Sequence, residues 1–232
     1  MDITNTSLRL ITGLPIPVSN EVYVYKVSLK EIIDMGYTSY SSILKFMCLS
    51  REYYEEAFGL SDITTLQYLK ALSLHEETAP TIISGMFLFF HADYRDGSFF
   101  INEHEITDEE FDEAQKIIKI RNGISSTEEA EDHPANDKAA ELLQKRKKYR
   151  EEIAKRKSDT SDIDFSDLIS IYASRTNLSI DVIIQYDIYQ FHNQFKRLKI
   201  YDDYETNMQA LMHGAKPDDI EIKYWISKIS DD

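Results

Sequence analysis

A run of apolar residues near the C-terminus follows the period of an α-helix for about four turns. Its members are Ile180, Ile183, Ile184, Ile188, Phe191, Phe195 and Leu198. Most of these residues are three or four positions apart, so they share one face of a helix, whereas a strand would need alternation at every second residue. The run therefore predicts a helix with one buried side. Asp187 offers an N-cap for a new helix if the chain breaks at Tyr186-Asp187.

Shorter apolar patterns on either side predict further helices in the same part of the chain. The preceding segment carries Phe165, Leu168, Ile169 and Tyr172 on one face, and the following segment carries Met208, Leu211 and Met212. Gly214 and Pro217 favour an end to the latter helix, because Gly adopts the left-handed conformation at helix ends and Pro cannot continue a helix. These patterns predict a helical C-terminal domain over residues 161–232.

The first 122 residues predict an α+β domain. Pro15 and Pro17 exclude helix, so residues 1–26 are expected to be extended, and the alternation over residues 22–27 predicts a short strand. Helical spacing and end signals predict helices at about residues 28–36, 40–47, 51–60, 61–74 and 107–122. Two of these helices begin with a capping box, formed by Ser28 with Glu31 and by Thr107 with Glu110.

A β-hairpin is predicted within the same domain. Phe87–His91 and Ser98–Asn102 are rich in apolar and aromatic residues, and Asp96-Gly97 lies between them. Asp-Gly supplies the positive φ angles that a tight hairpin turn requires. The whole chain is therefore expected to be mainly α-helical, with its small β-hairpin in the N-terminal α+β domain.

The sign of the charge changes between the two predicted domains. Residues 123–137 read as an acidic linker, and residues 138–160 as a basic helix. Nine Lys or Arg and three Glu give residues 138–157 a net charge of +6. The basic helix is interpreted either as a solvated helix that balances the linker or as a docking surface, and Lys145, Arg146 and Lys148 are its candidate binding residues.

Charge and motif content disfavour several classes of function. The net charge of −15 disfavours nucleic acid as a partner, although the basic residues 138–157 keep a nucleic-acid-binding regulator as a weaker alternative. The single cysteine, Cys48, excludes a disulfide framework and fits a structural thiol. Neither the six histidines nor the scattered glycines form a metal, phosphate or catalytic motif, so we expect no enzyme activity, cofactor or metal. The N-terminus lacks signal-peptide features and no apolar run spans a membrane, so a cytoplasmic, non-secreted protein is expected.

Aromatic and Met residues are the best candidates for a binding surface. The C-terminal domain holds more of them than a small helical unit needs for its core, and such residues suit an adaptable apolar groove. The candidate set is Tyr189, Phe191, Phe195, Leu198, Met208 and Met212. The sequence leaves open which of these residues contact a partner and which fill the core.

Three stretches resemble proteins from the tail-assembly region of tailed bacteriophages. The first is Asp187-Ile-Tyr-Gln-Phe-His-Asn-Gln-Phe-Lys-Arg-Leu198, preceded by Ser179-Ile-Asp-Val-Ile and followed by Tyr201 and Lys223-Tyr-Trp225. The others are Gly13-Leu-Pro-Ile-Pro17 and Ser28-Leu-Lys-Glu-Ile-Ile33, which are similar to the start of the same proteins. The resemblance implies a tail assembly chaperone, a small acidic helical protein that coats the tape measure protein in the host cytoplasm until tail-tube subunits replace it.

Two further questions stay open at this level. A structural or connector protein of the virion would fit the same resemblance, so the partner is expected to be the tape measure protein or another phage tail protein. Self-association is a further option.

The energetics of a carrier agree with the chaperone function. Covering exposed apolar area of a client contributes about 25 cal/mol per Å² to the free energy of binding. High like charge keeps the coated complexes apart.

Overall fold

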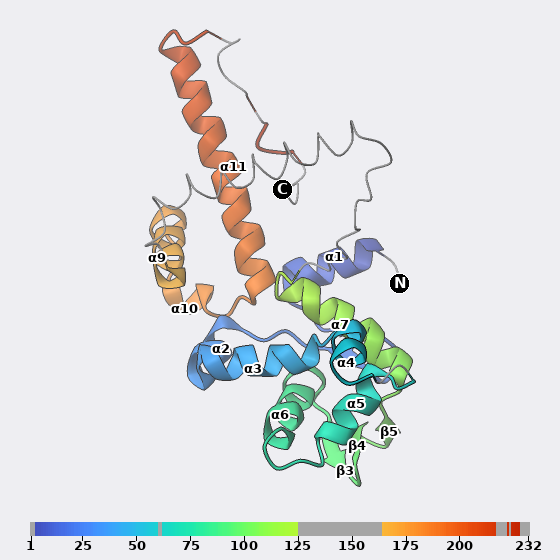
Figure 1. Ribbon diagram of the computed structural model, residues 1–232. Helices are drawn as coiled ribbons and strands as arrows, with labels where there is room; N and C mark the ends of the chain where they lie inside the picture. The colour runs from blue at the N-terminus through green and yellow to red at the C-terminus, as the bar shows by residue number, and fades with distance from the viewer. Residues whose placement is uncertain (1–2, 60–61, 125–163, 217–221, 223, 228–232) are drawn as a thin grey trace, which may run out of the picture. The chain divides into compact units, whose positions relative to one another are not determined.

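The computed structural model describes residues 3–59, 62–124, 164–216, 222 and 224–227 (Figure 1). It contains two compact units, one formed by residues 1–124 together with 184–232 and the other by residues 125–183. Residues 184–232 thus group with the N-terminal residues, which differs from the continuous C-terminal domain predicted over 161–232. The predicted basic helix, with Lys145, Arg146 and Lys148, and nearly all of the acidic linker lie outside the described residues.

The described part of the chain is mainly helical, as predicted. The helices of the first unit are α1 (Ile3–Thr12), α2 (Leu29–Met35), α3 (Tyr37–Met47), α4 (Arg51–Phe58), α5 (Thr65–Leu72), α6 (Ala79–Phe90), α7 (Asp108–Arg121) and α11 (Ile188–Met212). Its strands are β1 (Ile16–Pro17), β2 (Tyr23–Val24), β3 (Asp93–Arg95), β4 (Ser98–Ile101) and β5 (His104–Glu105). The second unit contributes α9 (Phe165–Thr176) and α10 (Ile180–Ile183).

Two small antiparallel sheets accompany these helices. In the first, β1 pairs with β2, so that Ile16 lies opposite Val24. In the second, β4 lies between β3 and β5, and Tyr94 lies opposite Phe99. The turn between β3 and β4 is Asp96-Gly97, with φ angles of 48° and 83°. The predicted hairpin turn is therefore confirmed, because these two residues supply the positive φ angles that a two-residue turn needs.

The predicted first strand of that hairpin was wrong. Residues 87–90 belong to α6, and the strand that pairs with β4 begins only at Asp93. A short apolar run cannot distinguish a buried strand from a buried helix by periodicity alone. Here the helix is favoured because Ile82, Met86 and Phe90 recur every fourth residue and are all buried.

The prediction of extended structure over residues 1–26 was also partly wrong. Residues 3–12 form α1, and the extended segment starts only after Gly13. A proline disfavours helix at its own position and at the residue before it, so Pro15 carried no information about the preceding turns. The short strand predicted within residues 22–27 is present as β2.

The predicted capping boxes are confirmed. In α2 the Ser28 side chain accepts from the backbone N–H of Glu31, while the Glu31 carboxylate accepts from the backbone N–H of Ser28. Thr107 and Glu110 form the same reciprocal pair at the start of α7. Each box satisfies donors that the first helical turn otherwise leaves without a partner.

The core of the first unit lies where α3 and α6 cross. The two helices approach so closely at Gly85 that a Cβ there would lie 3.0 Å from Ile43 Cγ2 and 3.1 Å from two Met47 atoms. The fully buried aromatic side chains of this unit are Tyr40, Tyr54, Phe89, Phe90, Phe99, Phe111 and Phe191. The last of these comes from α11, so the core draws on both ends of the chain.

The second unit has a small core of its own. Ile169 and Tyr172 of α9 and Ile183 of α10 are buried. Asn177 ends α9 in the left-handed conformation, with φ of 56°. The predicted helix at residues 165–172 is therefore confirmed, whereas the predicted stripe from Ile180 to Leu198 is divided between α10 and α11 by the break at Tyr186-Asp187.

Candidate functional site

Helix α11 carries all six aromatic, Leu and Met candidates, and its first turn is fixed to the core. Asp187 is its N-cap: Asp187 Oδ1 accepts from the backbone N–H of Gln190 at 2.7 Å, and Gln190 Oε1 accepts from the backbone N–H of Asp187 at 3.1 Å. The other Asp187 oxygen accepts from Arg121, the last residue of α7. A single carboxylate therefore both starts α11 and connects it to α7.

The Arg121–Asp187 pair is withdrawn from solvent. The two side chains are 2% and 3% exposed. Burial raises the pKa of Asp187, against its hydrogen bond from Gln190 and the attraction of Arg121. Burial likewise lowers the pKa of Arg121, against the attraction of Asp187. Both directions show that desolvation outweighs the mutual attraction, which is common for buried ion pairs.

Such a pair fixes one arrangement of the chain, because either charge left alone in the core would be costly. Arg121 Nη2 also donates to the Leu14 carbonyl at 2.6 Å, which joins α7 to the segment after α1. Gln190 Nε2 donates to the Ile11 carbonyl at 2.9 Å, within α1 itself. The start of α11 is thus held by α7 and by α1 together.

A third helix, α2, holds the segment before α11 through backbone hydrogen bonds. Leu29 and Lys30, at the start of α2, donate their backbone N–H groups to the carbonyls of Tyr186 and Ile184, each at 2.8 Å. The Lys26 ammonium donates to the Gln185 carbonyl at 2.7 Å. We call Asp187, Gln190 and Phe191, together with Arg121, the anchor of α11.

The structure separates the six candidates by burial. Phe191 is fully buried and belongs to the core. Tyr189, Phe195, Leu198 and Met208 are half-buried, and Met212 is 81% exposed. Phe191, Phe195 and Leu198 recur at i, i+4 and i+7, so they form one face that runs from the core outward along α11. The outer candidates therefore offer apolar area that the described fold does not fully bury.

A cluster of aromatic residues lies farther along α11, and the sequence pattern only partly indicated it. Tyr201 and Tyr204 of α11 meet two residues near the C-terminus edge to face: Tyr201 meets Trp225 at 6.0 Å between ring centroids, and Tyr204 meets Tyr224 at 5.6 Å. Arg197 Nη1 donates to the carbonyls of Trp225 at 3.0 Å and of Ser227 at 2.7 Å. We call residues 224–227 the aromatic turn, because Ser227 N–H donates to the Tyr224 carbonyl and closes it. The available signals were Tyr201 and the late Tyr224-Trp225 pair, and no helical pattern surrounds that pair.

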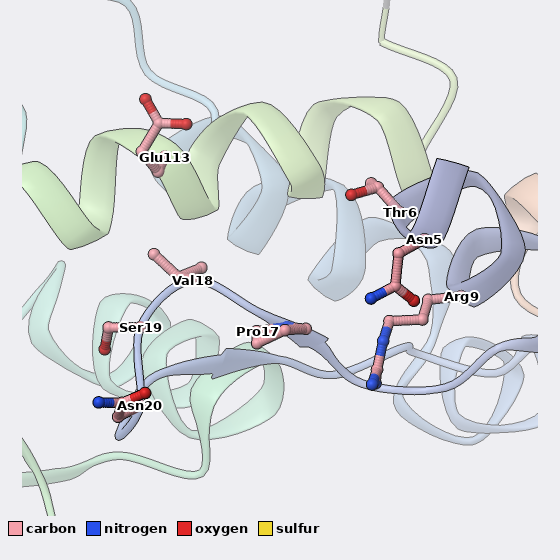
Figure 2. A pocket seen from close by; sticks show the side chains of 8 residues that line it. All are labelled: Asn5, Thr6, Arg9, Pro17, Val18, Ser19, Asn20 and Glu113. Carbon is pink, nitrogen blue, oxygen red and sulfur yellow. The ribbon is translucent and has the colours of Figure 1, made fainter. Parts of the chain in front are cut away.

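A cleft of about 480 Å³ lies between α1, the β1–β2 connection and α7 (Figure 2). Its lining residues are Asn5, Thr6, Arg9, Pro17, Val18, Ser19, Asn20 and Glu113. Arg9 Nη1 donates to the Pro15 carbonyl at 2.7 Å, so the guanidinium supports the cleft wall. In Figure 2 the Glu113 side chain points away from the strands that form the opposite wall.

Next to this cleft, Ser19, Glu110 and His104 are hydrogen-bonded in a row. Ser19 Oγ donates to Glu110 Oε1 at 2.6 Å, and His104 Nε2 lies 2.9 Å from Glu110 Oε2. Burial opposes ionisation of Glu110, but hydrogen bonds from Ser19, Thr107 and His104 together lower its pKa. The carboxylate stands between the hydroxyl and the imidazole, whereas nucleophilic catalysis needs the imidazole next to the hydroxyl. We interpret the row as a structural support for the α7 N-terminus.

Cys48 lies within the described residues as a free, half-buried thiol. Burial raises the pKa of Cys48 to about 11, so the thiol stays protonated at neutral pH. Within the described ranges no group of three or more His, Cys, Asp and Glu could hold a metal ion. In the same part of the chain, every helix is too short or too polar to cross a membrane.

Comparison with known protein families gives a match over the C-terminal third of the chain. Residues 154–230 match the family model of the YomV second domain. The match indicates similarity to a phage-type protein, a Bacillus phage YomV-like protein, for this part of the chain. No curated protein and no solved structure gives a match. The matched residues include α11 and the aromatic turn, so the candidate binding surface lies within the stretch that is similar to a phage protein.

Proposed function

We propose that this protein is a non-catalytic tail assembly chaperone of a tailed phage, and that α11 beyond its anchor binds the tape measure protein. The observation that carries the proposal is the apolar face of α11, which leaves the core at Phe191 and continues half-buried through Phe195 and Leu198. The phage-type match over residues 154–230 supports a role in phage biology, and the chaperone role rests on the resemblance in sequence.

The physical requirements of such a carrier favour this face. A tape measure protein is a long helix with apolar stripes, and an amphipathic helix docks against an apolar groove through residues at i, i+3, i+4 and i+7. The half-buried side chains of α11 can cover part of such a stripe at about 25 cal/mol per Å². Modest affinity per copy, repeated along a long client, gives a coat that is stable yet removable.

The charge of the chain suits a coat made of many copies. The formal net charge is −15 at pH 7. Complexes that carry this charge repel one another, which opposes the aggregation of coated clients. The repulsion is screened beyond about 8 Å at physiological salt, so the coat is expected to hold clients apart more weakly as the salt concentration rises.

Co-expression with the tape measure protein of the same phage tests the proposal. The wild-type chain is expected to keep the tape measure protein in the supernatant as a complex, and Phe195→Asp is expected to abolish that complex. Thr38→Asp is the matched control, because it adds the same charge at an exposed helical position on α3. Circular dichroism of both variants verifies that they fold.

Two outcomes would contradict the proposal. If the tape measure protein stays insoluble with the wild-type chain, the chaperone function is wrong. A virion structural or connector protein is the second candidate, because the phage-type match suits it equally. Mass spectrometry of purified particles separates the two functions, since a chaperone leaves before the tail is complete and a structural protein remains.

A further inference from the structure

The aromatic turn occupies a definite face of α11. Arg197, Tyr201, Tyr204 and Met208 recur at i, i+4, i+7 and i+11, so they lie in one line along the helix. Residues 224–227 meet the first three of these side chains: two through aromatic rings and one through backbone carbonyls. Leu198 and Tyr201 are three positions apart, so the two faces meet at these residues.

The contacts show what kind of segment this face accepts. Arg197 donates to two carbonyls that a single tight turn presents together, and a guanidinium suits this task because its N–H groups are fixed in one plane. Tyr201 and Tyr204 each receive an aromatic ring edge to face. The face is therefore complementary to a turn that carries two adjacent aromatic residues.

The fit is incomplete, which distinguishes the turn from a core element. Trp225 is 39% exposed, and Tyr224 and Ile226 are 55% and 60% exposed. In the core, by contrast, Phe191 is completely covered. Because the turn and its binding face belong to the same chain, weak contacts suffice to hold the turn there.

We propose that this face of α11 is a docking site for aromatic turns, that residues 224–227 occupy it in the free protein, and that the client displaces them when it binds. The proposal deepens the proposed function and rests on it for the identity of the client. The displaced segment makes release favourable, because the turn recaptures its face as soon as the client leaves. The client then covers Tyr201 and Tyr204 with the apolar stripe of its helix in place of the turn.

The sequence provides a built-in probe of this contact, because Trp225 is its single tryptophan. Arg197→Ala in the full-length chain is expected to shift Trp225 emission to longer wavelength. Acrylamide quenching is expected to rise about twofold, since a local opening would expose a ring that is only 39% exposed in the closed turn. Lys199→Ala is the matched control, because it removes the same charge from an exposed position on the same helix and is expected to change neither measurement.

A second variant separates release of the turn from unfolding. Tyr201→Ala is expected to increase the quenching in the same direction, while the far-ultraviolet circular dichroism of both variants stays at the wild-type value. If Trp225 is as quenchable in the wild-type chain as in Arg197→Ala, the turn is not held and the proposal is wrong. The same conclusion follows if Lys199→Ala exposes Trp225 as strongly as Arg197→Ala does.

Titration with a soluble segment of the tape measure protein tests the displacement itself. Binding of the client to the wild-type chain is expected to expose Trp225 and to shift its emission to longer wavelength, and the Arg197→Ala chain is expected to show a smaller change. A client that binds without any change in Trp225 would overturn the displacement. If no client binds while Arg197→Ala still releases Trp225, the chaperone function fails and the docking of the aromatic turn stands.

Discussion

The first turn of α11 and the rest of the same helix are in opposite situations. Asp187, Gln190 and Phe191 are buried, capped and joined to α1 and α7. From residue 192 to residue 212 every side chain is half-buried or exposed. Figure 1 shows α11 as the longest helix drawn in colour. The comparison indicates that the fold buries one end of this helix much more completely than the rest of its length.

This division has a physical basis. The first turn of a helix is costly to form, and most helix stability in proteins comes from packing of one face against the rest of the fold. The later turns of α11 therefore depend on the anchored first turn, which supplies the nucleus, and on partial cover such as the aromatic turn. A partner that covers these turns stabilises them further, which couples binding to the order of the helix.

The largest expected effect comes from removing the N-cap carboxylate. Asp187→Ala leaves Arg121 buried without its ion-pair partner and removes the cap of α11. Breaking a buried ion pair costs about 3–5 kcal/mol, and losing an N-cap costs about 1 kcal/mol more. Urea denaturation followed by circular dichroism measures the loss in free energy of unfolding. Asp203→Ala, at an exposed position on the same helix, is the control and is expected to stay within about 0.5 kcal/mol of wild type.

A loss below about 1 kcal/mol in Asp187→Ala would show that the first turn of α11 is not fixed by this pair. The anchor and the later turns would then be alike, and the comparison that supports the binding surface would not hold.

The second-largest expected effect is a loss of about 3 kcal/mol in the free energy of unfolding, and this loss depends on pH. In Arg121→Met the Asp187 carboxylate stays buried without its cation, so its pKa, already raised by burial in the wild-type chain, rises further above the ordinary value of 3.8. Between 3.8 and that folded-state pKa the folded chain binds a proton that the unfolded chain does not. The deficit relative to wild type is therefore full above the folded-state pKa of the variant and shrinks as the pH falls through that pKa, because the variant binds the stabilising proton before the wild-type chain does. Denaturation of both chains at pH 8, 6 and 5 measures the difference, and a deficit that grows on acidification would contradict it.

The anchor also shows how far the sequence could predict this fold. The Asp187 cap was accessible, because Asp before an apolar helical run is a local signal. Its partner Arg121 was not, since the two residues are 66 positions apart and the sequence carries no local trace of the pairing. The same limit applies to Gln190 and Ile11, which are 179 residues apart. Capping boxes and the Asp96-Gly97 turn were predicted correctly because each depends on neighbours in the sequence.

The candidate site shows the same limit. Helical spacing placed Phe191 and Phe195 on one face, but it could not show that only Phe191 reaches the core, because the α11 sequence is alike around both. The contact of Tyr204 with Tyr224 depends on a chain reversal between them, and a sequence pattern contains no information on where such a segment returns. Local patterns thus predicted the elements, and tertiary contacts decided their roles.

The third-largest expected effect is the loss of stability when a Cβ is added at Gly13, next to the anchor of α11. Gly13 has φ of +69°, and a Cβ there would lie 2.8 Å from Gln190 Oε1. Gly59 has nearly the same φ, +68°, with no atom within 4 Å of such a Cβ. Both Ala variants incur about 1 kcal/mol of backbone strain. Gly13→Ala is expected to lose about 1–2 kcal/mol more, because it displaces the amide that holds α11 to α1. Equal losses in the two variants, measured by urea denaturation, would mean that Gln190 can move without cost.

The smallest expected effect lies at the far end of α11. Met212 is 81% exposed, so Met212→Ala removes little buried area, and Ala is the better helix former. The free energy of unfolding is expected to stay within about 0.5 kcal/mol of wild type, against a loss of about 3–5 kcal/mol for Phe191→Ala in the core.

The yield of the tape measure complex is expected to fall in Met212→Ala, because exposed apolar area is what the client covers. A stability loss above about 1 kcal/mol in Met212→Ala would place this end of α11 in a packed core. The apolar face would then serve the fold, and the client would have to bind elsewhere on the chain.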